Sequence, residues 1–211
     1  MIGLVDYGMG NRRSVEKALV HVGAAVRVSG DPGVLRAAQG LVVPGVGAFP
    51  EAMERLERLG LAELIRERVA AGTPVLGICL GMQLAFARSE ELGGAEGLGI
   101  VPGDVRRLQA GSLKLPHIGW TEVRLRVQDE PLLEGLPERC AFYHVHSLAP
   151  VPAAAEDVIG EADYGETFVS AVRRGSFTGV QFHPEKSSAA GLRLLENFMH
   201  ICARQPAHAA S

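Results

Sequence analysis

Short apolar runs alternate with helical patterns along the first 90 residues of the chain. The runs have the length of buried strands, and they lie at residues 2–5, 24–28, 40–43 and 74–78. Between them, apolar residues recur at the spacing of helices, which we predict at residues 15–22, in two segments within 52–71 broken near Gly60, and at 82–87. Strands that alternate with helices predict a parallel sheet covered on both faces.

The second half of the chain has a different pattern. Its apolar runs are joined by turns, which indicates an antiparallel extension of the sheet, with strands at 101–108, 122–127, 140–145, 158–161, 168–172 and 177–181. Leu192, Leu195, Phe198 and Met199 predict a last amphipathic helix. We therefore predict one α/β domain over residues 1–202, an open, mostly parallel but mixed sheet with helices on both faces, and a flexible tail at 203–211.

Composition narrows the class of protein. Hydrophobic residues make up 47% and charged residues 21% of the 211 residues, the balance of a folded globular chain. A net charge of −3 gives no reason to expect nucleic acid or an anionic membrane as a partner. Three cysteines without paired spacing, and a start without a signal peptide or a membrane span, predict a cytoplasmic protein.

Cys79 stands between a predicted strand and a predicted helix, with Gly77 and Gly81 two residues to either side. Glycines relieve the crowding of a sharp strand-to-helix turn, which lifts a nucleophile above the edge of the sheet. The Leu80 N–H is placed to donate to an oxyanion, and the start of the helix favours a thiolate. On this motif alone, a buried structural cysteine is about as well supported as a nucleophile.

His183 and Glu185 end a strand near the C-terminus. A thiol nucleophile needs a general base, and the base needs an acceptor that orients it, roles that these two residues suit. Taken alone, a surface histidine before the turn proline is the simpler interpretation. A third motif is Gly45-Val46-Gly47, whose glycines permit a peptide N–H to complete an oxyanion hole; its simple alternative is a loop turn.

The three motifs together, in this order, resemble the class I glutamine amidotransferases. Within that class the chain is similar to the glutaminase subunits of imidazole glycerol phosphate synthase, over residues 2–202. The similarity rests on residues 6–11, 44–49, 77–83, 116–120 and 183–187. Thr121 and Leu148 depart from the family, which commonly has asparagine and tyrosine there.

The resemblance implies a catalytic triad of Cys79, His183 and Glu185, with L-glutamine as substrate. It implies contacts from Gln83 and Ser147 to the substrate, and places Asn11 and Lys186 at a partner interface. The partner is a (β/α)₈-barrel cyclase subunit that receives ammonia in histidine biosynthesis, in a heterodimer.

Other readings of the sequence lead to different functions. Gly8 and Gly10 begin a dinucleotide fingerprint, but Arg13 stands in place of its third glycine. His144 and His146 share a strand face and could bind zinc with His183, although no fourth ligand is evident nearby. We predict no cofactor and no metal. A glutaminase of another pathway, a cysteine hydrolase of esters or peptides, and a non-catalytic binding subunit remain alternatives.

Overall fold

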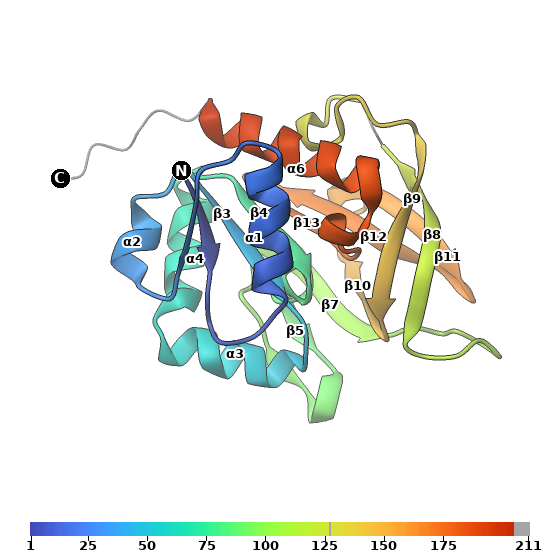
Figure 1. Ribbon diagram of the computed structural model, residues 1–211. Helices are drawn as coiled ribbons and strands as arrows, with labels where there is room; N and C mark the ends of the chain where they lie inside the picture. The colour runs from blue at the N-terminus through green and yellow to red at the C-terminus, as the bar shows by residue number, and fades with distance from the viewer. Residues whose placement is uncertain (127, 205–211) are drawn as a thin grey trace.

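A nine-stranded mixed sheet forms the centre of the protein (Figure 1). The computed structural model describes residues 1–126 and 128–204. The strands of this sheet are β1 (Ile2–Val5), β2 (Val26–Ser29), β3 (Gly40–Gly45), β4 (Val75–Cys79), β8 (His117–Leu125), β9 (Arg139–His146), β11 (Val158–Tyr164), β12 (Glu166–Arg174) and β13 (Phe177–Val180). Their order is β2-β1-β3-β4-β13-β12-β11-β8-β9. Pairing is parallel from β2 as far as β13 and antiparallel from β13 to β9.

Helices cover both faces of this sheet. The α-helices are α1 (Arg12–His21), α2 (Pro32–Arg36), α3 (Phe49–Arg58), α4 (Leu61–Ala70), α5 (Leu80–Gln83) and α6 (Ser188–Ala203). Single 3₁₀ turns are η1 (Glu91–Gly93), η2 (Pro131–Leu133), η3 (Ala155–Asp157) and η4 (Pro184–Lys186). Helices α1 and α6 pack on one face, and α2, α3 and α4 pack on the other. Within the described part of the chain, no helix combines the length and apolar character needed to cross a membrane.

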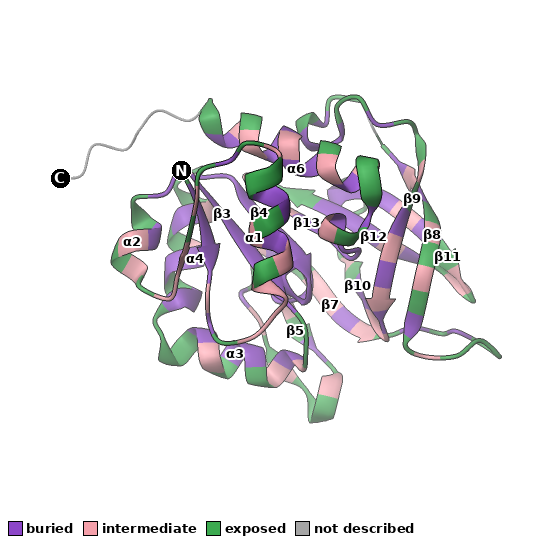
Figure 2. Cartoon of the chain, in the orientation of Figure 1, coloured by how far each residue is buried: buried purple, intermediate pink, exposed green. Residues whose placement is uncertain are grey.

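The parallel strands are buried on both sides because successive residues face different cores. On β3, Val42 packs with α1 and α6, whereas Leu41 and Val43 pack with α2, α3 and α4. Figure 2 shows these central strands in the colour of buried residues and the outer helix faces as exposed. Burial on both faces explains why the strands appear in the sequence as continuous apolar runs. The predicted α/β fold with a mixed sheet is confirmed.

A second, four-stranded sheet corrects two of the predictions. Its strands are β5 (Phe86–Ser89), β6 (Ala95–Glu96), β7 (Val101–Arg107) and β10 (Leu148–Pro152), in the order β10-β7-β5-β6. The helix predicted at 82–87 is wrong, because α5 ends at Gln83 and β5 follows. The strand predicted at 101–108 is β7, which pairs within this second sheet and does not extend the main one. Strand β5 is buried at both ends, at Phe86 and Ser89, and exposed at Arg88 between them.

The other predicted helices and strands are present, and the observed ones differ from the predictions mainly at their ends. Helices α3 and α4 meet at Gly60, whose φ of +68° lies in the left-handed region that glycine tolerates best. The short helix α2, introduced by Asp31 and Pro32, was not predicted. Of the predicted tail, Ala203 ends α6 and Arg204 follows it, and residues 205–211 lie outside the described part. That residues 1–202 form a single domain stays a prediction.

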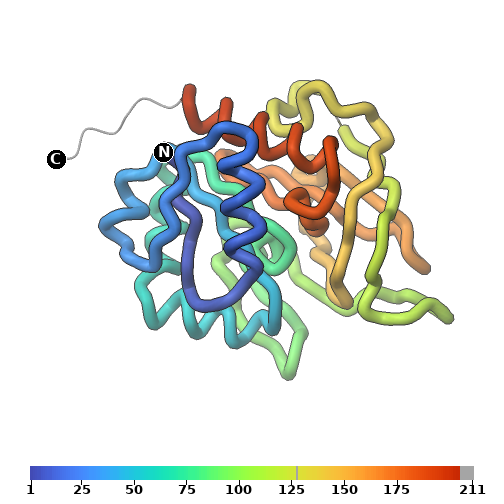
Figure 3. Tube along the Cα trace, in the orientation of Figure 1, coloured from blue at the N-terminus to red at the C-terminus, as the bar shows by residue number. Residues whose placement is uncertain are grey.

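The pairing of β13 with β4 brings the two halves of the chain together. These strands are parallel, with Val180 opposite Ile78, although about a hundred residues separate them along the chain. In Figure 3, orange segments of the trace lie beside segments of the N-terminal half, as this pairing requires. Because parallel strands end at the same edge of a sheet, the segments after Cys79 and after Val180 meet there.

The core next to this edge contains a stacked pair of aromatic side chains. Phe142 on β9 is fully buried and stacks on Phe182, with ring centroids 3.9 Å apart. We predict that Phe142→Ala lowers the free energy of unfolding by about 3 to 5 kcal/mol, because it leaves a cavity under the sheet. Urea unfolding followed by circular dichroism measures this loss. Leu113→Ala, at a side chain that is 47% exposed, is the control and should change stability little; an equal loss in both variants contradicts the prediction.

Candidate active site

Cys79 lies at a strained turn between β4 and α5. Its backbone has φ +54° and ψ −110°, a conformation that costs a residue with a side chain about 1 to 3 kcal/mol. The flanking glycines make the turn possible. A Cβ on Gly81 would lie 1.8 Å from the Val43 carbonyl oxygen, and one on Gly77 would lie 2.6 Å from the Gly81 carbonyl oxygen. The turn therefore needs glycine at both positions. Since α5 has only four residues, its dipole offers the thiol the support of a single turn.

His183 and Glu185 follow β13 and reach the same edge of the sheet. His183 Nδ1 lies 2.9 Å from Glu185 Oε1, and both side chains are almost completely buried. The backbone of His183 is held on both sides: its N–H donates to the Tyr143 carbonyl, and its own carbonyl accepts from the Ser187 hydroxyl. These contacts to β9 and η4 fix the imidazole, and Glu185 fixes its tautomer by accepting from Nδ1.

The electrostatics of His183 favour an imidazolium. Burial lowers its pKa, but its interactions with the Cys79 thiol and with Glu185 together outweigh burial and raise the pKa to about 9. The nucleophile and the base are therefore coupled, and a proton can pass between them during the reaction. Such a pair can attack a carbonyl carbon and then protonate a leaving group.

The Gly45-Val46-Gly47 loop follows β3, the strand next to β4. Gly45 is opposite Cys79 in the parallel register. A Cβ on Gly45 would lie 2.6 Å from the Tyr7 hydroxyl and 2.8 Å from the Leu80 Cβ. Only glycine therefore fits between these two side chains. The Tyr7 hydroxyl donates to the Pro44 carbonyl at 2.7 Å and anchors the start of the loop. Burial and the nearby Cys79 raise the pKa of Tyr7, which keeps it a neutral donor.

A cavity of about 280 Å³ opens over Cys79, large enough for a small amino acid. Most of the site residues predicted from the sequence line it. The lining residues are Val46, Gly47, Cys79, Leu80, Gln83, Glu91, Val145, His146, Ser147, Leu148, His183 and Lys186. Among the described residues, Gly45 and Glu185 stand behind this lining, and Asn11 lies at the start of α1 outside it.

The histidines considered as zinc ligands are engaged in the protein interior. His144 Nδ1 donates to the Phe142 carbonyl and Nε2 accepts from the Ser170 hydroxyl, at 3.1 and 2.9 Å. Burial lowers the pKa of His144 to about 2 and that of His146 to about 3, so both are neutral. Within residues 1–126 and 128–204, no three histidine, cysteine or acidic side chains are placed to hold a metal ion.

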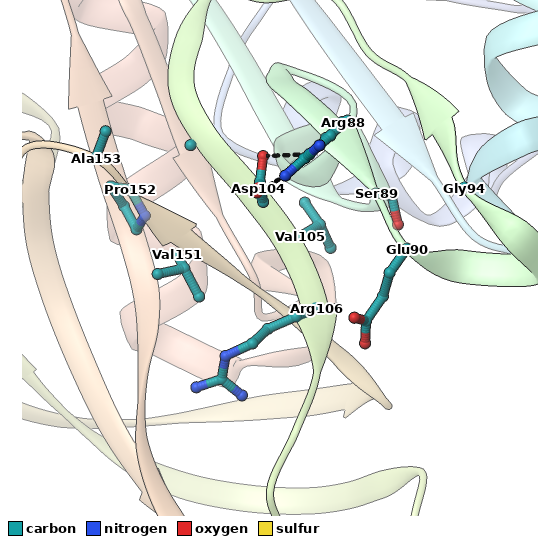
Figure 4. A pocket seen from close by; sticks show the side chains of 11 residues that line it. Arg88, Ser89, Glu90, Gly94, Asp104, Val105, Arg106, Val151, Pro152 and Ala153 are labelled. Carbon is teal, nitrogen blue, oxygen red and sulfur yellow. Dashed lines mark hydrogen bonds and ion pairs between the residues drawn. The ribbon is translucent and has the colours of Figure 1, made fainter.

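A larger cavity, of about 630 Å³, lies on the second sheet (Figure 4). Both of its arginines are already paired: Arg88 binds Asp104 through two hydrogen bonds, and Arg106 binds Glu166 in the same way. Glu90 accepts from the Arg107 backbone N–H. Its lining contains neither a cysteine nor a histidine, and its one hydroxyl, Ser89, has no base beside it of the kind that His183 provides for Cys79. The chemistry of this protein therefore concentrates in the smaller cavity over Cys79.

Comparison with known proteins agrees with this geometry. The family model of class-I glutamine amidotransferases matches residues 3–202. The imidazole glycerol phosphate synthase subunit HisH of Moorella thermoacetica is 50% identical over 197 residues, which cover 93% of each chain. The HisH subunit of Methanosarcina barkeri is 45% identical over 203 residues, 95% of this chain and 98% of that one. This chain belongs to the class I glutamine amidotransferases, in the HisH family.

Solved structures of other proteins share the fold at low sequence identity. PurLQS from Thermotoga maritima superposes with a TM-score of 0.77 at 18% identity, over 95% of this chain and 97% of that one. The glutaminase domain of Trypanosoma brucei CTPS, solved with bound acivicin, gives 0.70 at 20% identity, over 97% and 94%. Of the two glycines that begin the dinucleotide fingerprint, Gly8 and Gly10, Gly10 packs against Gly45 in the structure.

The two departures from the family pattern have local explanations in this amidotransferase. The Thr121 hydroxyl lies 2.8 Å from His117 Nε2 and can donate the hydrogen bond that this buried ring nitrogen needs. Leu148 contributes through its backbone, since its carbonyl accepts from Gln83 at 3.1 Å and from His146 at 2.8 Å. These backbone contacts do not depend on whether the side chain is leucine or tyrosine.

The structure adds two residues that sequence reasoning missed, Tyr7 and Gln181. Tyr7 belongs to the motif at residues 6–11, and its buried hydroxyl at the nucleophile's edge could not be foreseen from that motif. Gln181 lies two residues before His183 and donates to the Cys79 sulfur. A polar residue that ends a buried strand just before a candidate base was the available signal.

The coupling of His183 to Glu185 leads to a titration test. We predict that Glu185→Gln lowers the pKa of His183 from about 9, because it removes a negative partner of the imidazolium while the burial that lowers the pKa remains. Nuclear magnetic resonance titration of the His183 ring measures the change. Glu196→Gln, which removes an exposed partner of Arg193 on α6, is the control and should leave the titration unchanged. An unchanged His183 titration in Glu185→Gln contradicts the assignment.

Proposed function

We propose that this amidotransferase hydrolyses L-glutamine to glutamate and ammonia through a thioester on Cys79, and that the ammonia passes to a cyclase subunit of imidazole glycerol phosphate synthase in histidine biosynthesis. The observation that carries the proposal is the buried pair of His183 and Glu185, whose histidine lines with Cys79 a cavity sized for an amino acid. The identity to named HisH subunits supports the choice of pathway. We place the reaction in the cytoplasm, since all three cysteines are free thiols.

The first half of the reaction forms a bond to sulfur. The Cys79 thiolate adds to the side-chain carbonyl carbon of glutamine, and negative charge develops on the carbonyl oxygen. The N–H of Leu80 and an N–H of the Gly45-Val46-Gly47 loop donate to this oxygen. His183 then gives its proton to the amide nitrogen, the carbon–nitrogen bond breaks, ammonia leaves, and a γ-glutamyl thioester stays on Cys79. Each oxyanion donor contributes about a hundredfold to a thousandfold in rate in enzymes of this kind.

The second half of the reaction restores the enzyme. A water molecule attacks the thioester carbon while His183 takes its proton, as the neutral imidazole left by the first half permits. The carbon–sulfur bond breaks, glutamate leaves, and the thiolate and imidazolium are recovered. Glu185 accepts from Nδ1 of His183 and stabilises the imidazolium each time it forms.

Gln83 and Ser147 provide the recognition of the amino acid end of the substrate. The Gln83 amide donates both of its N–H groups within the protein, to the Leu148 carbonyl and to Gln181. Its carbonyl oxygen is therefore the atom left for a ligand in the cavity, and an acceptor suits the α-ammonium group of glutamine. The Ser147 hydroxyl, in the same lining, suits the α-carboxylate.

An apolar patch beside the cavity supports a protein partner. Ile118 and Trp120 share the outer side of β8 and are 60% and 55% exposed, unusual for side chains of this size. Trp120 packs edge-on against Tyr143, and the Lys186 ammonium lies 5.9 Å from the centre of the Tyr143 ring. Since Lys186 also lines the cavity, the patch adjoins its mouth. We assign this patch, with Asn11, to the interface with the (β/α)₈-barrel cyclase in a heterodimer.

The loop at Gly45 suits a switch controlled by this partner. Gly47 has a φ of +115°, and the glycines on both sides of Val46 allow the peptide between Gly45 and Val46 to rotate. We propose that docking of the ligand-bound cyclase turns this peptide so that its N–H faces the oxyanion. Glutamine hydrolysis by the free subunit as fast as by the complex contradicts this switch.

Glutamate release from glutamine tests the proposed function. We expect strong release only when the subunit is combined with the cyclase barrel and its nucleotide ligand, and none from Cys79→Ala in the same complex. Activity that depends on Cys79 but not on this partner assigns the glutaminase to another synthase. No release under any condition, from a subunit that is folded by circular dichroism, contradicts the glutaminase itself.

The interface assignment has its own test. We predict that Trp120→Ala weakens binding to the cyclase by about 2 kcal/mol, roughly thirtyfold in Kd, because exposed tryptophans are typical interface anchors. Isothermal titration calorimetry of the two subunits measures the loss. Leu59→Ala, at a 39% exposed side chain at the end of α3, is the control and should bind like the unaltered chain. Equal affinities for Trp120→Ala and the control exclude the patch from the interface.

A further inference from the structure

The Gln181 side chain lies between Cys79 and Gln83, the residue proposed to bind the substrate. It follows β13, is fully buried, and its backbone N–H donates to the Ser170 carbonyl at 2.8 Å. Its Nε2 donates to the Cys79 sulfur at 3.6 Å, and its Oε1 accepts from Gln83 Nε2 at 2.9 Å. The reaction steps described above make no use of this amide, although it touches the reacting atom.

The orientation of the Gln181 amide follows from its neighbours. The Leu148 carbonyl can only accept, so Gln83 must turn its NH₂ group toward it. The same NH₂ group faces Gln181, which must therefore present its carbonyl oxygen. The Gln181 NH₂ group is then left on the side of Cys79. A chain of three contacts thus begins at a backbone carbonyl and ends with an N–H donor on the sulfur.

We propose that Gln181 is a further catalytic residue of this glutaminase, an N–H donor that stabilises the Cys79 thiolate. A hydrogen bond to a charged group is about twice as strong as one between neutral groups, so the donor favours the thiolate over the thiol. The Val145 carbonyl, 3.8 Å from the sulfur, has the opposite effect because it can accept only from the thiol. The proposal rests on the proposed function in that it takes Cys79 as the nucleophile.

The donor acts at both halves of the reaction. When the thiolate attacks, the sulfur loses its charge to the new carbon–sulfur bond, and the contact with Gln181 weakens. When water breaks that bond, the electron pair returns to sulfur, and the Gln181 N–H stabilises the departing thiolate. A leaving thiol of lower pKa departs faster, so the residue speeds hydrolysis of the thioester.

Other groups around the sulfur also affect its ionisation. His183 and Tyr7 both interact with the Cys79 charge, and Glu185 acts through His183. Glu91, His146 and Lys186 line the same cavity. A variant at Gln181 leaves all of these groups in place, so a change in the thiol's titration reports on the amide.

Alkylation of Cys79 by iodoacetamide tests the proposal without any glutamine. The reagent reacts with thiolates, so its rate against pH gives the pKa of the thiol, and peptide mass spectrometry separates Cys79 from Cys140 and Cys202. We expect Gln181→Met, which keeps the volume and removes the amide, to raise the pKa of Cys79 by about one unit. At any pH below the pKa of the unaltered chain, this shift lowers the fraction of thiolate about tenfold. An alkylation profile that matches the unaltered chain overturns the proposal.

Two further variants separate a catalytic role from a structural one. Asn197 is another buried amide, with both N–H groups bonded to backbone carbonyls, and it lies on α6 away from Cys79. Asn197→Leu should lower the melting temperature and leave the alkylation profile unchanged. If Gln181→Met does not fold, Gln181→Glu keeps the shape and places a carboxylate oxygen at the sulfur, and it should raise the pKa of Cys79 further; an unchanged profile there overturns the proposal. Since alkylation needs no glutamine, its result stands whether or not the subunit proves to be a glutaminase.

Discussion

The turn at Cys79 is the constraint on which the rest of the site depends. A left-handed backbone at a residue with a side chain is unfavourable, and the close approach of Gly81 to the Val43 carbonyl leaves the chain no room to relax. The surrounding sheet holds the turn because β3 and β13 lie on either side of β4. The same two strands deliver the Gly45 loop and His183 to the sulfur. The same strand order therefore holds the strained turn and brings to Cys79 the groups that act on it.

His183 is the histidine of the site whose environment favours a charge. His183 and Glu185 are buried together, and the loss of hydration that would keep the imidazole neutral is offset by the thiol and the carboxylate beside it. His144 and His146 lie close by without such partners, and burial keeps them neutral. Neighbouring histidines therefore differ in charge because of what they touch, and this difference separates the proposed base from structural histidines.

The sequence predicted the parallel half of the fold and the three motifs of the site, and it failed where local patterns are ambiguous. Continuous apolar runs such as residues 74–78 indicate buried strands because both faces of the sheet are covered. Residues 82–87 are equally apolar, and without knowledge of the second sheet their strand could not be told from a helix. The position of Gln181 next to the sulfur depends on the pairing of β13 with β4, a contact between distant segments that a local motif cannot predict.

In the proposed reaction, Cys79 is the nucleophile of a site shaped for glutamine. The most direct measurement is labelling of the complex with a chloroketone analogue of glutamine, followed by peptide mapping of the three cysteines. We expect a label on Cys79 alone, at a rate that L-glutamine slows and L-asparagine does not. Labelling of Cys140 or Cys202 in preference to Cys79, or a rate that glutamine leaves unchanged, would contradict it.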